Sequence, residues 1–311
     1  MKILPKVLPV VIIIFFLAAC KKETLIENKP PVVNAGNDTT FQLAAGAQND
    51  TISLSGSAID ADGQVVGYAW SQISGPNTVK ILYPGSATTK ISGVISGQYV
   101  FQLMATDDKG ATGVKSVTIL VKAPQVYTLT LQPNNNPNES SVYSYVPNGN
   151  GVGTPQLAIG AWTNSGTPVY NRTYIKFDYT IPAGATILSA KFSLYAIPNP
   201  LAGNFVDAHY GLANSFNIQR ITAAWTATSI SWNNQPATTT VDQITVPNST
   251  SSFQNNNDID VTQLVKDMQQ NGNNGFALRL LTENYYNIRQ YISSYNTDLT
   301  KHPKLVIQYS N

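Results

Sequence analysis

Gly97-Gln98-Tyr99-Val100-Phe101-Gln102-Leu103 is the stretch from which the fold class follows most directly. Side chains of a strand point alternately to its two faces, so Tyr99, Phe101 and Leu103 would share one face. The same alternation returns in residues 116–121, and β-rich segments separated by Gly, Pro and Asn turns cover residues 51–54 and 65–70. Short strands at regular spacing, with turn signals between them, are typical of a β-sandwich or barrel.

A second block of strand segments begins near residue 127. Its segments cover residues 127–131, 174–179, 191–196, 276–281 and 304–309. One stretch, residues 263–270, has helical spacing of Leu264, Val265 and Met268, and Asn271-Gly272 is its stop signal. The sequence therefore predicts an all-β chain with one short helix and two domains, residues 31–123 and 124–311.

The N-terminus has the pattern of an export signal. Lys2 and Lys6 are followed by a short apolar run and then by Leu17-Ala18-Ala19-Cys20, which holds the only cysteine of the 311 residues. A membrane-spanning helix needs about 20 apolar residues, and this run is shorter. The ending resembles the lipobox of bacterial lipoproteins, which implies a signal peptide over residues 1–19, a lipid on Cys20 and a polar tether over residues 20–30. The expected location is extracytoplasmic, at the outer membrane and on the cell surface.

The charge balance narrows the classes of partner. Loss of Lys2 and Lys6 with the signal peptide would leave 17 Lys plus Arg against 17 Asp plus Glu. Zero net charge argues against nucleic-acid binding, which needs a basic stripe, and also against electrostatic attachment to anionic lipid. Charged residues make up 12% of the chain, about half the usual share, as expected for an extracytoplasmic β-protein with neutral polar surfaces.

An ordered series of motifs spans the first block. It runs through Asn34-Ala35-Gly36-Asn37-Asp38, Asp60-Ala61-Asp62-Gly63, Tyr68-Ala69-Trp70 and Thr106-Asp107-Asp108-Lys109-Gly110. The series resembles PKD domains, which implies an immunoglobulin-like sandwich that serves as a spacer or adhesion unit and is not catalytic. Trp70 and Tyr99 would fill its core from neighbouring strands. Gly63 would supply the positive φ of a turn, and Asp107 and Gly110 would bracket a tight hairpin.

Four aspartates of this block allow two interpretations. They are Asp38, Asp60, Asp62 and Asp107. Convergence at one end of the sandwich would give carboxylate ligands for a structural Ca²⁺ ion. Alternatively, each carboxylate caps a turn by accepting backbone hydrogen bonds. No other cofactor is expected.

A second series of motifs spans the second block. It includes Asn171-Arg172-Thr173-Tyr174-Ile175-Lys176-Phe177-Asp178, Arg220-Ile221-Thr222-Ala223-Ala224-Trp225, Ser229-Ile230-Ser231-Trp232 and His302-Pro303-Lys304-Leu305. The series resembles the disaggregatase-related (DNRLRE) domain and the alginate-associated carbohydrate-binding modules close to it. The resemblance implies a jelly-roll β-sandwich. One departure is that Thr226 and Ala227 follow the first tryptophan, where an acidic residue is common.

Aromatic residues of this block divide into expected core and candidate ligand contacts. Trp225 and Trp232 are expected in the core, because tryptophan is heavily buried on average. Arg172 is expected to pair with Asp178, Asp258 or Asp260. Glycan-binding candidates are aromatic or basic residues in polar, Gly- or Asn-rich surroundings: Trp162, Tyr170, Arg172, His209, Tyr210, Tyr285, Tyr286, Arg289 and Tyr291. The alternative is that the tyrosines simply line strand faces.

The sequence contains no recognisable catalytic constellation. Only His209 and His302 are histidines, and none of the nucleophile-elbow, metalloprotease, phosphate-loop or dinucleotide motifs occurs. We therefore expect a non-catalytic surface lipoprotein whose jelly roll binds a polysaccharide, with an acidic, alginate-like chain among the candidates because rings stack on sugars and arginine pairs with carboxylates. The alternative is a structural or adhesive protein of the cell envelope that binds a protein partner.

Overall fold

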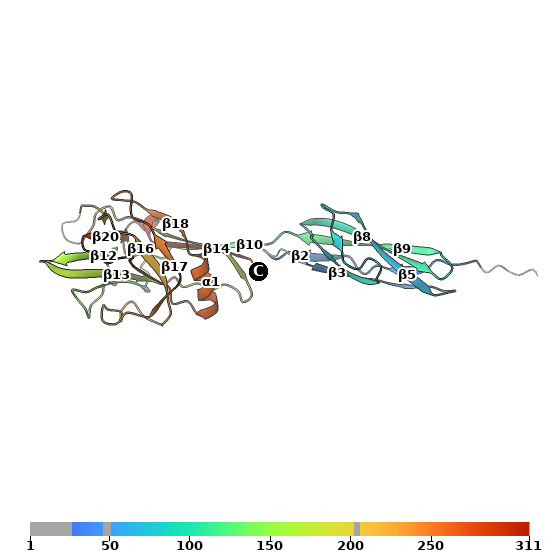
Figure 1. Ribbon diagram of the computed structural model, residues 1–311, viewed down its shortest axis with the longest axis horizontal. Helices are drawn as coiled ribbons and strands as arrows, with labels where there is room; N and C mark the ends of the chain where they lie inside the picture. Colours follow the sequence, from blue (N-terminus) through green and yellow to red (C-terminus); the bar gives the residue numbers. More distant parts are fainter. Residues whose placement is uncertain (1–26, 46–50, 202–205, 311) are drawn as a thin grey trace, which may run out of the picture. The chain divides into compact units, whose positions relative to one another are not determined.

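The computed structural model describes residues 27–45, 51–201 and 206–310 of the chain, which fold into two compact units (Figure 1). The predicted signal peptide, Cys20 and most of the tether lie outside the described residues. Within the described part, no helix has both the length and the apolar character required to cross a membrane.

The first unit contains three small antiparallel sheets. One pairs β1 (Val32–Asn34) with β4 (Ser57–Ile59). The second has the order β2 (Thr39–Gln42), β9 (Thr112–Lys122), β8 (Gly97–Asp107) and β5 (Val65–Ser74). The third has the order β3 (Thr51–Ser55), β7 (Thr88–Ser92) and β6 (Lys80–Ile81).

Strand β8 carries the core of this unit, as its alternation predicts. Tyr99, Phe101 and Leu103 are fully buried. Trp70 on β5 lies directly opposite Leu103, and its indole N–H donates to the carbonyl of Ala87 at 3.2 Å. The prediction that Trp70 and Tyr99 fill the core from neighbouring strands is therefore confirmed.

Two turns of the first unit differ in why they need glycine. Gly110, in the hairpin after Asp107, has a φ of 91°, a conformation that only glycine adopts readily. The predicted positive φ at Gly63 is wrong, since Gly63 is not among the positive-φ residues of the described chain. Glycine is needed there for space instead: a Cβ would lie 2.2 Å from Asp108 Oδ1 and 2.5 Å from Asp60 Oδ2.

The second unit is a β-sandwich with one α-helix among its described residues, α1 (Thr262–Asn271). The larger sheet has the order β15 (His209–Tyr210), β20 (Asn287–Ile292), β12 (Gln156–Asn164), β13 (Thr167–Ile175), β19 (Phe276–Leu280), β16 (Phe216–Ile221) and β17 (Thr238–Val246), and β11 (Glu139–Tyr143) also pairs with β13. The smaller sheet has the order β10 (Val126–Leu131), β21 (Lys304–Ser310), β14 (Thr186–Leu194) and β18 (Asn256–Asp260).

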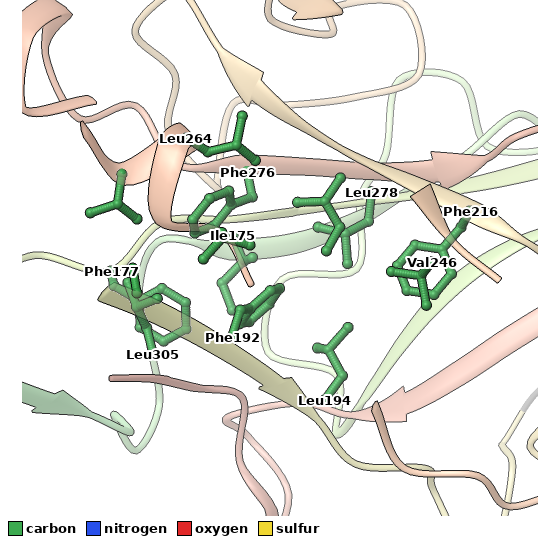
Figure 2. Packing of buried hydrophobic residues seen from close by; sticks show 14 of the residues in the cluster. Ile175, Phe177, Phe192, Leu194, Phe216, Val246, Leu264, Phe276, Leu278 and Leu305 are labelled. Carbon is green, nitrogen blue, oxygen red and sulfur yellow. The ribbon is translucent and has the colours of Figure 1, made fainter. Parts of the chain in front are cut away.

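The core of the second unit fills the space between its two sheets and the helix. The rings of Phe177, Phe192 and Phe276 converge there (Figure 2), and Phe192 stacks on Phe276 with ring centroids 5.4 Å apart. Helix α1 buries Leu264, Val265 and Met268 against this core, as the sequence predicts. Burial of this apolar surface is the main favourable term in folding.

The structure tests two sequence predictions for this unit, the packing of two tryptophans and the length of strand β13. Trp225 and Trp232 pack against a smaller buried cluster around Tyr174, so their assignment to packing is confirmed. The predicted strand over residues 174–179 is too long, because β13 ends at Ile175. Beyond that point the backbone pairs with loops, and the Lys176 N–H donates to the carbonyl of Asn138 at 2.9 Å.

Candidate functional site

The second unit contains a cavity of about 890 Å³. Its lining is rich in tyrosine and in uncharged polar side chains. The described lining residues are Tyr143, Tyr145, Thr154, Gln156, Ala158, Trp162, Thr163, Asn164, Val169, Asn171, Leu201, Val206, Asp207, Tyr210 and Ile288. Concave sites of this size with a few polar groups are the usual form of a ligand pocket.

Two of the predicted aromatic candidates, Trp162 and Tyr210, line this cavity, and a third, Tyr286, contacts the indole of Trp162. Trp162 on β12 contacts Tyr210 at the end of β15, with ring centroids 5.4 Å apart and planes at 76°. Tyr286 contacts the same indole from the turn before β20, at 5.0 Å and 86°. Edge-to-face contacts of this kind are favourable beyond the area they bury. Tyr210 and Tyr286 remain 50% and 53% exposed, so Trp162 orients two rings that are open to a ligand.

Asn287 and Gly211 hold the two tyrosine-bearing turns together. The side-chain oxygen Oδ1 of Asn287 accepts a hydrogen bond from the Ala213 N–H at 2.8 Å. The side-chain amide nitrogen Nδ2 of Asn287 donates to the backbone carbonyls of Asn284 and Tyr285, each at 3.1 Å. Gly211 has a φ of 86°, and a Cβ there would lie 2.3 Å from the carbonyl oxygen of Tyr286. The sequence thus brings the backbones of residues 211 and 286 into direct contact, which fixes the spacing of the two rings.

Tyr286 itself has an unusual backbone. Its φ is 65°, in the left-handed region that bulky residues rarely adopt. The conformation separates two neighbouring side chains: Tyr286 contacts Trp162, whereas Tyr285 contacts Tyr170. Such outliers occur where the surrounding structure over-determines the backbone, and they concentrate at functional sites.

Several cavity residues were missed by the sequence analysis. The ring centroids of Tyr143 and Tyr145 lie 5.6 Å apart, and Tyr145 is 53% exposed. Asn171 is buried in the lining, and its side-chain carbonyl oxygen has no hydrogen-bond partner within the described residues. The signal for Tyr145 was its place beside a Pro-, Asn- and Gly-rich loop, the criterion used for the other candidates. No local pattern indicated Asn171, because β13 and β11 bring it to the site.

The cavity floor is stiffened by an amide network. Gln156 on β12 donates to the side-chain carbonyl of Gln290 on β20 at 2.7 Å, and it accepts from the Leu201 N–H at 2.8 Å. Both glutamines are buried. Hydrogen-bonded buried amides hold their neighbours in fixed positions, since breaking one bond leaves a desolvated polar group.

Tyr170, Arg172 and Tyr285 form a separate group outside the cavity lining. The Arg172 guanidinium forms two hydrogen bonds with the Glu283 carboxylate, 2.8 and 2.9 Å long, and lies 4.6 Å from the centroid of the Trp232 ring. Tyr170 stacks on the same indole with ring centroids 5.9 Å apart. The predicted pairing of Arg172 with Asp178, Asp258 or Asp260 is therefore wrong, because the partner is Glu283. The indole already contacts both Arg172 and Tyr170, which indicates a packing role.

The assignment of His209, Arg289 and Tyr291 as exposed glycan contacts is wrong. Arg289 and Tyr291 are fully buried, and His209 is 3% exposed. The Arg289 guanidinium donates to Asn214, Asn256 and the carbonyl of Pro247, and Tyr291 donates to Asn256 at 2.6 Å. Burial lowers the pKa of His209 to about 4, so its ring is neutral at pH 7, and Nε2 lies 2.8 Å from the Gln254 carbonyl oxygen. These residues support β15, which carries Tyr210, and β20, which follows the turn of Tyr286.

The four aspartates of the first unit accept hydrogen bonds from backbone groups. Asp38 accepts from the Thr118 N–H, Asp60 from the Asp62 N–H, and Asp107 from the N–H groups of Lys109 and Ala111. Asp62 accepts from the Lys29 N–H and also pairs with Lys109 at 3.2 Å. Within the described ranges no three His, Cys, Asp or Glu side chains lie close enough together to hold a metal ion. Asp60 and Asp107 cap local turns, as the second interpretation predicts, whereas Asp38 and Asp62 accept from backbone groups distant in the sequence. The Ca²⁺ interpretation stays a prediction.

The described lining of the cavity offers aromatic rings and hydrogen-bonding side chains. Among its described lining residues only Asp207 is charged. Glycoside hydrolysis uses a pair of carboxylates on opposite sides of the scissile bond, and the lining residues that the structure describes include one carboxylate, that of Asp207. The two arginines that suggested an acidic ligand are both engaged: Arg172 with Glu283, and Arg289 in the interior.

Comparison with known proteins identifies both units. The second unit has the features of a carbohydrate-binding β-sandwich: two sheets, an aromatic cavity and exposed tyrosines. The chain belongs to carbohydrate-binding module family 96, whose model matches residues 148–309. The first unit matches the K319L-like PKD domain over residues 35–121. Both are non-catalytic module types. The predicted PKD domain and carbohydrate-binding module are thus confirmed.

Curated relatives match the first unit. The mouse dyslexia-associated protein KIAA0319-like protein is 35% identical over 95 residues, which cover 30% of this chain and 9% of that protein. Human low-density lipoprotein receptor-related protein 11 is 32% identical over 95 residues, 30% of this chain and 18% of that protein. The chain therefore spans only a small part of the length of these relatives.

Solved structures match as well. The PKD1 domain of Vibrio anguillarum Epp is 31% identical and covers 32% of this chain and 100% of that chain, with a TM-score of 0.24. A structure described as the basis of promiscuous specificity in carbohydrate-binding modules of the β-sandwich superfamily is 14% identical, covers 92% of this chain and 93% of that chain, and has a TM-score of 0.24.

Proposed function

We propose that this protein is a non-catalytic surface lipoprotein that binds polysaccharide in the cavity around Trp162. Its lipid anchor is Cys20, and the PKD domain serves as a spacer. The observation that carries the binding proposal is the pair of half-exposed rings, Tyr210 and Tyr286, held edge-on by the indole of Trp162, which lines a cavity in a carbohydrate-binding module.

The physical basis is the amphipathic character of a sugar ring. Its C–H face packs on an aromatic ring, and its hydroxyls need hydrogen-bond partners at the edge. Tyr210 in the cavity lining and Tyr286 beside Trp162 supply the rings, and the uncharged polar side chains Asn164 and Thr163 belong to the lining. Because the rings are already held in place by Trp162, binding costs little side-chain entropy.

Anchoring gives weak sugar contacts their biological use. A lipid on Cys20 would confine the module to a membrane surface, and local concentration rather than intrinsic affinity would then determine retention of a polymer. Intact-mass analysis of the membrane-extracted protein tests this part. Loss of residues 1–19 with a lipid adduct on Cys20 is expected; an unmodified N-terminus retaining Met1 would contradict it.

Affinity electrophoresis of the full chain in gels with neutral and acidic polysaccharides, alginate included, tests the binding site. We expect the double variant Tyr210→Ala/Tyr286→Ala to lose retardation by about tenfold or more, since each ring contributes on the order of 1 kcal/mol of apolar contact. Tyr285→Ala is the matched control, because Tyr285 is 42% exposed and adjacent in sequence but contacts Tyr170 instead. Equal losses in both variants, or no retardation of the wild type by any polymer, would refute the proposal; in the second case a pull-down for a protein partner becomes the decisive experiment.

A further inference from the structure

We infer that the cavity selects uncharged sugar chains over chains of uronic acids, with Asp207 as the residue that rejects a carboxylate. This inference rests on the proposed function, because it specifies the ligand class of the same site. It replaces the acidic ligand suggested by the sequence with one that the charges of the site favour.

The first observation is the charge of the lining. Among the described residues that line the cavity there is no Lys, Arg or His, and Asp207 contributes a negative charge. A site that recognises carboxylates normally presents a guanidinium or ammonium group, because a desolvated carboxylate without a cationic or strong donor partner is costly. The described lining of this cavity instead carries a negative charge, that of Asp207.

The second observation is that the two arginines closest in the sequence analysis to a ligand role, Arg172 and Arg289, add no positive charge to the described cavity lining. Arg289 lies on β20, beside the cavity strand β12, but its guanidinium is fully buried on neutral acceptors. Arg172 is bound to Glu283 through two hydrogen bonds. A uronate would therefore have to displace an existing carboxylate from Arg172 or enter the protein interior to reach Arg289.

The third observation is an acceptor without a donor. The side-chain carbonyl oxygen of Asn171, in the cavity lining, has no hydrogen-bond partner among the residues that the structure describes. Because this oxygen is buried, a sugar hydroxyl can donate to it only after the Asn171 side chain turns towards the cavity; a carboxylate, which only accepts, would gain nothing from that turn. The acceptor and Asp207 thus favour the same class of ligand, a hydroxyl-rich and uncharged one.

The test compares polymers that differ only in charge. Alginate and polygalacturonate are each paired with their carboxyl-reduced form, and the full chain is titrated with each polymer at low and at moderate salt. We expect tighter binding of the reduced forms. Asp207→Asn should raise the affinity for the native uronates by about threefold at low salt, since the removed charge lies close to the ligand, and leave the reduced forms unchanged.

The matched control is Asp242→Asn. It makes the same change of charge in the same unit, at an exposed position on β17 where a φ of 57° suits asparagine as well as aspartate. Salt should strengthen uronate binding by screening the repulsion from Asp207. Tighter binding of the uronates that weakens with salt, or equal effects of the two Asn variants, would overturn the selectivity while leaving polysaccharide binding intact. If none of the four polymers binds, the proposed function fails as well, and this inference falls with it.

Discussion

The indole of Trp162 meets the ring of Tyr286 edge-on, with the centroids 5.0 Å apart and the planes at 86°. Trp162 lies on β12 and Tyr286 in the turn before β20, and these strands pair directly. The contact therefore exists only when two segments more than a hundred residues apart are in register. The arrangement of these two rings depends on this pairing and on the turn that carries Tyr286.

Gly211→Ala should disturb both stability and the site. A Cβ at this position would lie 2.3 Å from the Tyr286 carbonyl oxygen, and the φ of 86° disfavours any side chain. Gly184→Ala is the control, because Gly184 has a φ of 84° with nothing within 4 Å of the added Cβ. We expect Gly184→Ala to cost about 1 kcal/mol from backbone strain alone. Gly211→Ala should cost more in chemical denaturation and also weaken polysaccharide retention. Equal costs for the two variants would show that the close approach is unimportant.

Arg289→Met should destabilise the second unit without acting as a binding variant. It removes one donor each from Asn214, Asn256 and the Pro247 carbonyl. Asn214 and Asn256 keep one donor each, the Ser249 N–H and the Tyr291 hydroxyl. We expect a loss of about 3 kcal/mol in the free energy of unfolding. Arg279→Met, at a partly buried arginine on β19, should cost less than about 1 kcal/mol. An unchanged unfolding midpoint combined with lost polysaccharide binding would instead support the original assignment of Arg289 as a ligand contact.

Arg172 and Glu283 should be energetically coupled. The two side chains are 18% and 20% exposed and form a two-bond ion pair. A double-mutant cycle with Arg172→Met and Glu283→Gln should give a coupling of about 1–2 kcal/mol in denaturant unfolding. The pair Lys176–Asp178, with Asp178 69% exposed, serves as the comparison and should give less than about 0.5 kcal/mol. Similar coupling in the two pairs would argue against a structural role of Arg172.

Glu139→Gln should change how stability depends on pH. Burial raises the pKa of Glu139 from 4.5 to about 7, while the carboxylate accepts hydrogen bonds from Ser294. Between these pH values the folded protein holds a proton that the unfolded chain has released, so this residue makes stability fall as pH rises from 4.5 to 7. Glu139→Gln lacks this loss of stability. The free energy of unfolding of the variant, minus that of the wild type, should therefore be up to about 3 kcal/mol higher at pH 8 than at pH 4.

His209 acts in the opposite direction over an overlapping range. Because burial lowers the pKa of His209 to about 4, its contribution to stability is complete above pH 6.5 and is lost as the pH falls towards 4. The measurement is therefore the difference in unfolding free energy between wild type and Glu139→Gln at each pH, from which the His209 contribution cancels. A difference that does not vary with pH would contradict the assignment of a raised pKa to Glu139.

Local patterns predicted those parts of the molecule in which one face is buried and the other is solvated. Strand β8 alternates, and its inward residues were identified from that alternation. Helix α1 was found from the spacing of its apolar residues. Strand β20 gave no such signal, because all six of its residues, from Asn287 to Ile292, are buried, and its polar composition resembled a loop. That is why Arg289 and Tyr291 were taken for exposed residues.

The sequence by itself determined the all-β class, the two domains with their family relationships, and the idea that aromatic residues in polar segments bind sugar. The tertiary structure alone decided which of those residues are available. It placed Trp162, Tyr210 and Tyr286 together, turned Arg289 inward and gave Arg172 a partner 111 residues away. The physical reason is that alternation and turn chemistry act over a few residues. Exposure and ion pairing at this site depend instead on the register of strands that are distant in the chain.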